Sequence, residues 1–166
     1  APGTSRERKI RKEESMENWK SVDEILDFAI KGEEEAAEFY TDMATRVEKE
    51  WMKKAFLNFA KEEQGHKAKL EAIKSGKKLF PAQKTVLDLK IGDYLVEAEV
   101  KPEMDYQDAL IVAMKKEKAA FRLYSDLANS TDDENLRNTL LALAHEEANH
   151  KLRFEVEYDE FVLREN

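Results

Sequence analysis

The chain has 166 residues, enough for one ordinary domain with a single buried core. Five glycines, three prolines and 39% charged beside 42% apolar residues indicate long amphipathic helices, so we expect an all-α fold. The formal charge of −8 argues against nucleic-acid binding, and the lack of cysteine excludes disulfides, iron–sulfur centres, zinc-thiolate sites and a thiol nucleophile. Any bound metal must therefore use Glu, Asp and His.

The N-terminal residues 1–15 are polar, rich in Arg, Lys and Glu, and precede Met16. We expect them to be a vector-derived or disordered leader, followed by a single domain over residues 16–166. No apolar run approaches the ~20 residues needed to cross a bilayer, and the N-terminus has no apolar signal-peptide core. We therefore expect a cytoplasmic protein that does not contact membranes.

The first half of the domain predicts two helices, because apolar residues such as Ile25, Phe28, Ala29 and Met43 recur three and four positions apart. Residues 75–104 then carry Gly76, Pro81, Gly92 and Pro102, which typically interrupt helices. A connection of this length is far longer than a usual helix–helix loop and can cross the full length of a bundle. It favours a ferritin-like topology, with either a short helix or an extended piece over residues 85–100.

The second half predicts a helical hairpin with a turn over residues 129–133, where Thr131 and Glu134 have the spacing of a capping box. Position 132 is midway between Glu117 and Glu147. Each of these acids is about fifteen residues from the turn, roughly 22 Å along its helix at 1.5 Å per residue. The two carboxylates must therefore lie at the same level of the bundle.

An internal repeat relates the two halves. Residues 29–44 align with residues 113–128 at an offset of 84, with seven identities in sixteen positions, and residues 57–71 align with residues 141–155 at the same offset, with seven in fifteen. The fold class we predict is therefore an all-α, ferritin-like four-helix bundle made of two duplicated helical hairpins joined by a long crossover connection at about 75–104. By the repeat, the first hairpin bends around residues 47–51.

The repeat also pairs the residues that can bind metal. Each half contributes one Glu-x-x-His motif, which places a carboxylate and an imidazole on one helical face, and one Glu from the partner helix. Two lone Glu and two Glu-x-x-His motifs are the ligand arrangement of di-metal carboxylate bundles. The predicted metal ligands are Glu33, Glu63, His66, Glu117, Glu147 and His150.

Helical phase and the repeat choose among neighbouring acids, because Glu34 aligns with Lys118, which cannot be a ligand. Four inward-facing carboxylates would repel one another unless cations lie between them. With oxygen and imidazole ligands, two iron ions are the leading choice, with manganese or zinc as alternatives. The plainer reading is that the Glu-x-x-His pairs face solvent.

Two further aromatic residues repeat with the ligands. Tyr40 and Tyr124 are predicted to pack in the core with a hydrogen bond, and contact with a ligand carboxylate is the alternative. His145 aligns with Lys61, so we expect it on the surface.

These residues resemble the rubrerythrin branch of the ferritin-like superfamily, through Glu33 with Tyr40 seven positions later, Glu63-x-x-His66, and the second copy of this pattern, over about residues 22–161. The resemblance implies that Glu63 and Glu147 bridge two irons. It implies that Glu33 and Glu117 are terminal ligands, and that His66 and His150 each complete one iron.

The chain departs from rubrerythrins proper at two points. They carry a further Glu three residues after the second lone Glu, where this chain has Ala120, which argues for the plainer ligand set of ferritins. They also usually carry a rubredoxin domain whose iron needs four cysteines, and this chain has none. Any electrons must therefore come from a separate donor, such as a rubredoxin-type protein.

By resemblance, we expect an oxidoreductase of rubrerythrin type in which a di-iron site reduces hydrogen peroxide or dioxygen. A ferroxidase that stores or delivers iron is the alternative, and a non-catalytic bundle stabilised by its metals is a further one. A homodimer or larger homo-oligomer is expected.

Overall fold

The computed structural model describes residues 4–6, 21–76, 89, 91–96 and 104–165. Four long helices, α2 (Val22–Arg46), α3 (Glu50–Ser75), α5 (Tyr106–Asn129) and α6 (Glu134–Glu165), account for most of them, with a short 3₁₀ helix η1 (Ile91–Asp93). All regular secondary structure in these ranges is helical, which confirms the predicted all-α four-helix bundle. None of the helices in the described ranges has a stretch long and apolar enough to span a membrane.

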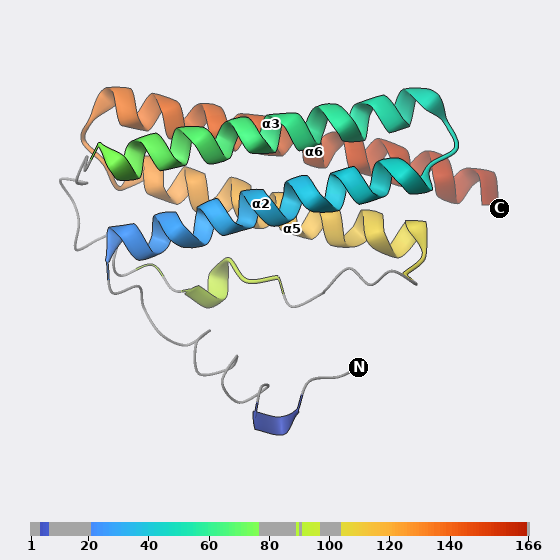
Figure 1. Ribbon diagram of the computed structural model, residues 1–166, viewed down its shortest axis with the longest axis horizontal. Coiled ribbons are helices and arrows are strands. Elements are labelled where there is room, and N and C mark those ends of the chain that lie inside the picture. Colours follow the sequence, from blue (N-terminus) through green and yellow to red (C-terminus); the bar gives the residue numbers. More distant parts are fainter. Residues whose placement is uncertain (1–3, 7–20, 77–88, 90, 97–103, 166) are drawn as a thin grey trace.

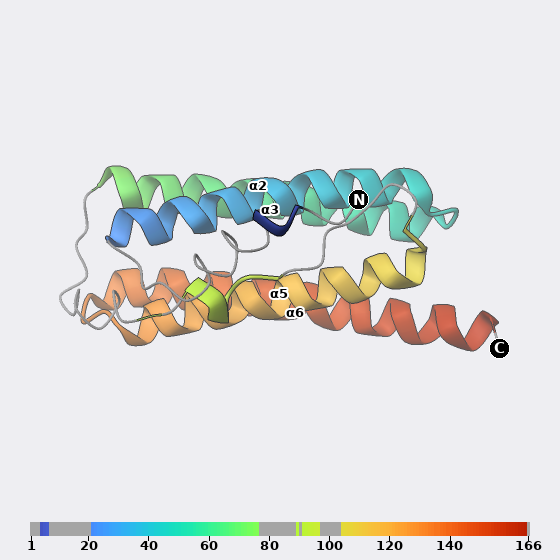
Figure 2. The ribbon, with the colours of Figure 1, turned by 90° about the horizontal axis from the view of Figure 1, so that it is seen from below.

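The bundle consists of two hairpins, α2–α3 and α5–α6, which lie over one another as two layers (Figure 2). In Figure 1, α3 ends at the opposite end of the bundle from the start of α5, so the chain must cross its full length between the two hairpins. This is the topology predicted from the length of the 75–104 connection. Most of that connection lies outside the described residues, as does nearly all of the predicted leader; η1 is the short helix that the connection contributes.

Local signals explain most of the helix boundaries. The first bend covers residues 47–49, within the predicted range. Ser21 caps α2 by accepting a hydrogen bond from the Glu24 backbone N–H at 3.1 Å. The predicted capping box at α6 is wrong, because α6 begins at Glu134 and Asp133 is its cap, accepting from the Leu136 N–H at 3.0 Å. Thr131 instead accepts from the Asp133 N–H at 3.2 Å and tightens the turn.

The apolar core is divided into two clusters. One contains Ile25, Leu70 and Leu127 and lies toward the start of α2, and the other contains Met43, Phe56 and Phe154 and lies toward its end. All six of these side chains are fully buried. Burying each such side chain stabilises the fold by roughly 1.5–3 kcal/mol. Between the two clusters, the same helices carry a layer of buried acids and histidines.

Candidate metal centre

The six predicted ligands meet at one level in the middle of the bundle. Every helix contributes: α2 and α5 provide one glutamate each, and α3 and α6 provide one Glu-x-x-His pair each. Each side chain is only 1–3% exposed. The solvent-facing reading of the two motifs is therefore wrong, and the level predicted for Glu117 and Glu147 is confirmed.

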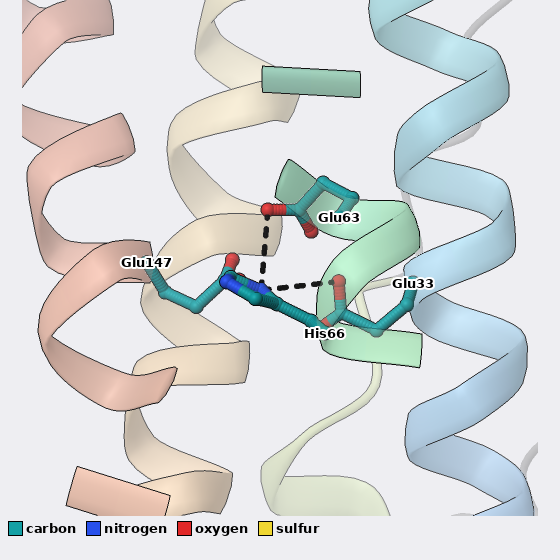
Figure 3. Close-up of side chains that lie close together, drawn as sticks. All are labelled: Glu33, Glu63, His66 and Glu147. Atoms are coloured by element: carbon teal, nitrogen blue, oxygen red, sulfur yellow. Dashed lines mark ion pairs between the residues drawn. The ribbon is translucent and has the colours of Figure 1, made fainter. Parts of the chain in front are cut away.

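The six residues form two overlapping groups whose ligand atoms lie within 4.8 Å of one another and could each hold a metal ion. One group is Glu33, Glu63, His66 and Glu147, and the other is Glu63, Glu117, Glu147 and His150. Glu63 and Glu147 belong to both groups, the position that a bridging carboxylate occupies. Figure 3 shows the first group, with side chains from α2, α3 and α6 converging on one point.

The histidines face the cluster through Nδ1. His66 Nδ1 lies 2.6 Å from Glu147 Oε1 and 3.6 Å from both Glu33 Oε2 and Glu63 Oε1. His150 Nδ1 lies 2.9 Å from Glu63 Oε1 and 3.7 Å from Glu117 Oε1. The two imidazole rings are stacked, with centroids 6.3 Å apart.

Each of the six side chains has one buried atom without a hydrogen-bond partner among the described residues: Glu33 Oε2, Glu63 Oε1, His66 Nδ1, Glu117 Oε2, Glu147 Oε1 and His150 Nδ1. A buried polar atom left unpaired costs about 1–3 kcal/mol, and more when it is charged. Without a metal, only protons can offset this cost, where His66 Nδ1 approaches Glu147 Oε1 and His150 Nδ1 approaches Glu63 Oε1, so the cluster is suited to cations. Oxygen and imidazole nitrogen donors without sulfur suit iron, manganese or zinc, so the cluster fits two such ions.

Burial and mutual repulsion disfavour ionised carboxylates in this cluster when no cation is bound. Burial raises the pKa of Glu117 to about 8. Burial, followed by the charge of Glu147, raises the pKa of Glu63 well above its usual value, and burial with the charge of Glu117 does the same for Glu147. Glu33 is the exception: burial opposes ionisation, but contacts with Glu63 and His66 lower its pKa.

The pKa values of the two histidines are also raised, but by the attraction of neighbouring carboxylates rather than by burial. Burial lowers the pKa of His66, but contacts with Glu147 and Glu33 outweigh burial and raise this pKa to about 11. Burial likewise opposes protonation of His150, but Glu63 raises its pKa to about 9. In the metal-free protein, protons therefore supply the positive charge that the cluster needs, and a metal ion must displace them.

Both repeated tyrosines contact the cluster directly. The Tyr40 hydroxyl donates to Glu117 Oε1, and the Tyr124 hydroxyl donates to Glu33 Oε1. Each tyrosine thus holds the lone glutamate of the other hairpin and leaves that glutamate's second oxygen facing the cluster. Both rings are 1% exposed, so core packing and contact with a predicted ligand, which the sequence offered as alternatives, hold together.

Sequence analysis missed two acids that orient the imidazoles. His66 Nε2 is hydrogen-bonded to Glu146, and His150 Nε2 to Glu62, in both cases across the two hairpins. These contacts leave Nδ1 of each ring facing the cluster. The repeat contained the signal, because Glu62 and Glu146 are identical residues at the offset of 84. His145, by contrast, is exposed as predicted.

Replacing Glu146 with alanine is expected to lower metal affinity about 10- to 100-fold, because the His66 ring loses the partner that fixes its orientation and tautomer. Anaerobic calorimetric titration with Fe²⁺ measures the change. Glu160→Ala, which removes an exposed acid from the same helix, is the control and should bind as the unaltered protein does. Equal affinities in the two variants would show that packing alone holds the ring.

Comparison with known proteins shows two solved structures with a similar fold. No curated protein matches the chain. Among solved structures, a ferritin-like diiron-carboxylate protein from Thermotoga maritima superposes with a TM-score of 0.70 at 21% identity, covering 87% of this chain and 97% of its own. A hypothetical protein from Pyrococcus furiosus superposes with a TM-score of 0.68 at 31% identity, covering 84% and 89%.

The first of these likenesses shows the fold, and the sequence itself shows the family. Residues 24–160, which include all four long helices in large part and all six clustered residues, match the rubrerythrin family. The resemblance drawn from the repeated Glu and Glu-x-x-His pattern is thereby confirmed, and the chain belongs to the rubrerythrin family.

Proposed function

We propose that this protein binds two iron ions and is an oxidoreductase that reduces hydrogen peroxide or dioxygen with electrons from a separate donor. The proposed ligands are Glu33, Glu63, His66, Glu117, Glu147 and His150. When bound, a diferrous pair supplies two electrons to such an oxidant. Glu63 and Glu147, which belong to both groups of ligand atoms, would contact both ions, and each of the other four residues would hold one.

The observation that carries the proposal is the set of six buried side chains whose ligand atoms converge in two groups that share Glu63 and Glu147. Membership of the rubrerythrin family and the fold shared with a diiron-carboxylate protein support iron over manganese and zinc. Iron, unlike zinc, also changes oxidation state in an oxygen and imidazole site, which the reduction of peroxide requires.

The chain's own residues prepare the site in three ways. The tyrosine hydroxyls hold Glu33 and Glu117 in place, Glu62 and Glu146 orient the imidazoles, and the two apolar clusters fix the helices on either side of the site. Ligands held in advance need little rearrangement when the charge on the metals changes. Because the sequence has no cysteine, we propose a rubredoxin-type protein as the donor.

The proposal is tested by loading the protein with Fe²⁺ without oxygen and mixing it rapidly with hydrogen peroxide or with dioxygen. We expect oxidation of the iron pair within the mixing experiment, and repeated turnover when a reductant is added. Zinc-loaded protein is the control and should not react, because Zn²⁺ has no redox chemistry. A diferrous site inert to both oxidants would defeat the proposal.

The same experiment separates the alternatives. Continued uptake of Fe²⁺ beyond the two sites, together with a closed shell of many subunits by light scattering, would indicate iron storage. If the two irons stay bound, react with neither oxidant, and no further iron is taken up, the metals serve only to stabilise the bundle. We expect a homodimer or other small homo-oligomer with steady turnover of peroxide or dioxygen.

A further inference from the structure

A cavity of about 370 Å³ lies between α2 and α5 and reaches the proposed metal centre. Its inner end is formed by Glu33, Glu63, Glu117 and Glu147, and residues 94–96, which follow η1, cover it from outside. The exposed side chains of Lys31 and Glu35 also line it, so it opens to solvent on this face. The cavity is thus a route from the surface to the cluster.

The cavity exists because the facing surfaces of α2 and α5 carry small residues. Gly32 and Ala36 line it from α2, and Ala119 and Ala120 line it from α5. A Cβ atom added at Gly32 would meet nothing within 4 Å. Glycine inside a helix costs about 1 kcal/mol relative to alanine. Alanine would thus fit at position 32 and would stabilise the helix, so glycine is not there for the stability of α2.

The wall of the cavity is mostly apolar, and the segment that covers it, residues 94–96, is hydrogen-bonded to α5. Besides these small residues, the apolar part of the wall includes Phe28, Ala29, Leu95, Val96 and Leu123. Tyr94, at the start of the cover, is 4% exposed and donates a hydrogen bond at 2.6 Å to Asp126 on α5. The apolar cavity is therefore bounded by α2 and α5 and by a covering segment that is hydrogen-bonded to α5.

The volume of this space is far larger than hydrogen peroxide needs. A water molecule occupies about 30 Å³ in the liquid, and hydrogen peroxide has one further heavy atom. Pockets of about 300–1,000 Å³ with apolar walls and a few polar groups at one end typically bind small organic molecules. Here the polar end is the cluster itself, so a bound molecule would present a polar head to the metals and an apolar body to the wall.

We infer that the substrates of this site include organic hydroperoxides, whose apolar substituent occupies the cavity while the peroxide group reaches the metal centre. The inference rests on the proposed function. In such a reaction the O–O bond of ROOH would break on uptake of two protons and of two electrons, which a diferrous pair held by these ligands would supply. The products are the alcohol ROH and water. The separate donor then returns the two electrons to the iron pair.

The first arm of the test measures binding without chemistry. The probe is 2-phenyl-2-propanol, the alcohol formed from cumene hydroperoxide, titrated into the metal-free full chain and followed by NMR. We expect saturable shifts confined to residues of the cavity, such as Ala120 and Val96. Gly32→Leu should weaken this binding at least about tenfold, because it places a side chain in the space that the ring would occupy.

The second arm compares two oxidants on the diferrous protein. The rate of iron oxidation is measured with cumene hydroperoxide and with hydrogen peroxide, and the ratio of the two rates is the readout. Gly32→Leu and Ala120→Leu should each lower this ratio at least about tenfold. The matched control is Gly65→Leu, at the other helical glycine where an added Cβ meets nothing, because Gly65 does not line the cavity. Its ratio should equal that of the unaltered protein.

The outcomes separate this inference from the proposed function. If hydrogen peroxide oxidises the iron pair but cumene hydroperoxide does not, or if both cavity variants leave the ratio unchanged, the inference is wrong and the proposed function stands. If neither peroxide reacts with the unaltered protein but dioxygen does, this inference is wrong and the proposed function stands. If the unaltered protein reacts with neither peroxide and not with dioxygen, the proposed function fails and this inference fails with it. Iron content is measured in each variant, and Ala120→Leu decides the result if Gly32→Leu disturbs iron binding at the adjacent Glu33.

Discussion

Glu147→Ala is expected to abolish binding of both metal ions, the largest effect that any single ligand substitution should have. Glu147 belongs to both groups of converging ligand atoms and lies 2.6 Å from His66 Nδ1. Its removal takes one oxygen ligand from each ion and leaves Glu63 as the only shared carboxylate. Elemental analysis after anaerobic loading with Fe²⁺ and gel filtration should find almost no iron. Glu63→Ala should behave in the same way.

Two matched variants control this prediction. Glu33→Ala removes a ligand from one group only, so it should retain one ion. Tyr40→Phe removes a hydrogen bond to Glu117 but no ligand, so at saturating iron it should retain both. Equal iron content in Glu147→Ala, Glu33→Ala and Tyr40→Phe would show that the ligands have been assigned incorrectly.

Removal of the metals is expected to lower the melting temperature by about 10 °C at neutral pH. A ligand present at a thousand times its Kd stabilises the folded state by about 4 kcal/mol. For a chain of this size, each kcal/mol shifts the melting temperature by roughly 2–4 °C. Calorimetric melting of the loaded and the metal-free protein measures the difference. Identical melting temperatures would mean that the cluster does not need cations in order to be buried.

The size of this difference should depend on pH. Glu117 has a folded-state pKa of about 8 against a usual value of 4.5, so the stability it contributes is complete below pH 4.5 and is lost as the pH rises through 8. His150, raised from 6.5 to about 9, contributes stability below pH 6.5 that is lost as the pH rises through 9. The metal-free protein should therefore lose stability between pH 5 and 9.

Metal binding should show the opposite dependence on pH, because iron displaces protons from these same groups and its affinity rises as they ionise. The gap in melting temperature between loaded and metal-free protein should accordingly widen from pH 5 to pH 8. Proton release on adding Fe²⁺, measured in two buffers of different ionisation enthalpy, provides an independent check. A constant gap and no proton release would contradict the protonated state of the empty cluster.

Much of the proposed centre could be predicted because it depends on local geometry. In Glu63-x-x-His66, the helix alone places both side chains on one face, and the offset of 84 supplies the second copy. The first bend, for which the sequence has no glycine or proline, followed from the same repeat. These features need only helical periodicity and the equivalence of the two halves.

The features that the sequence did not predict depend on contacts between helices. Glu62 and Glu146 have helical phases that point toward the outside, and their side chains remain 50% and 40% exposed. Their carboxylates reach the histidines because the two layers are close at this level, which periodicity cannot show. The cavity is similar: its small residues are visible in the sequence, but the space they leave depends on how α2 faces α5 and on the segment that covers them.

The hydrogen bonds that orient the imidazoles run from each hairpin to the other, His66 to Glu146 and His150 to Glu62. A lone hairpin therefore carries half of a centre and would need an identical twin to complete it. Because both hairpins belong to one polypeptide, their sequences can differ at equivalent positions. Gly32 and its counterpart Lys116 have diverged and both line the cavity, so the two halves contribute unlike residues to a single opening.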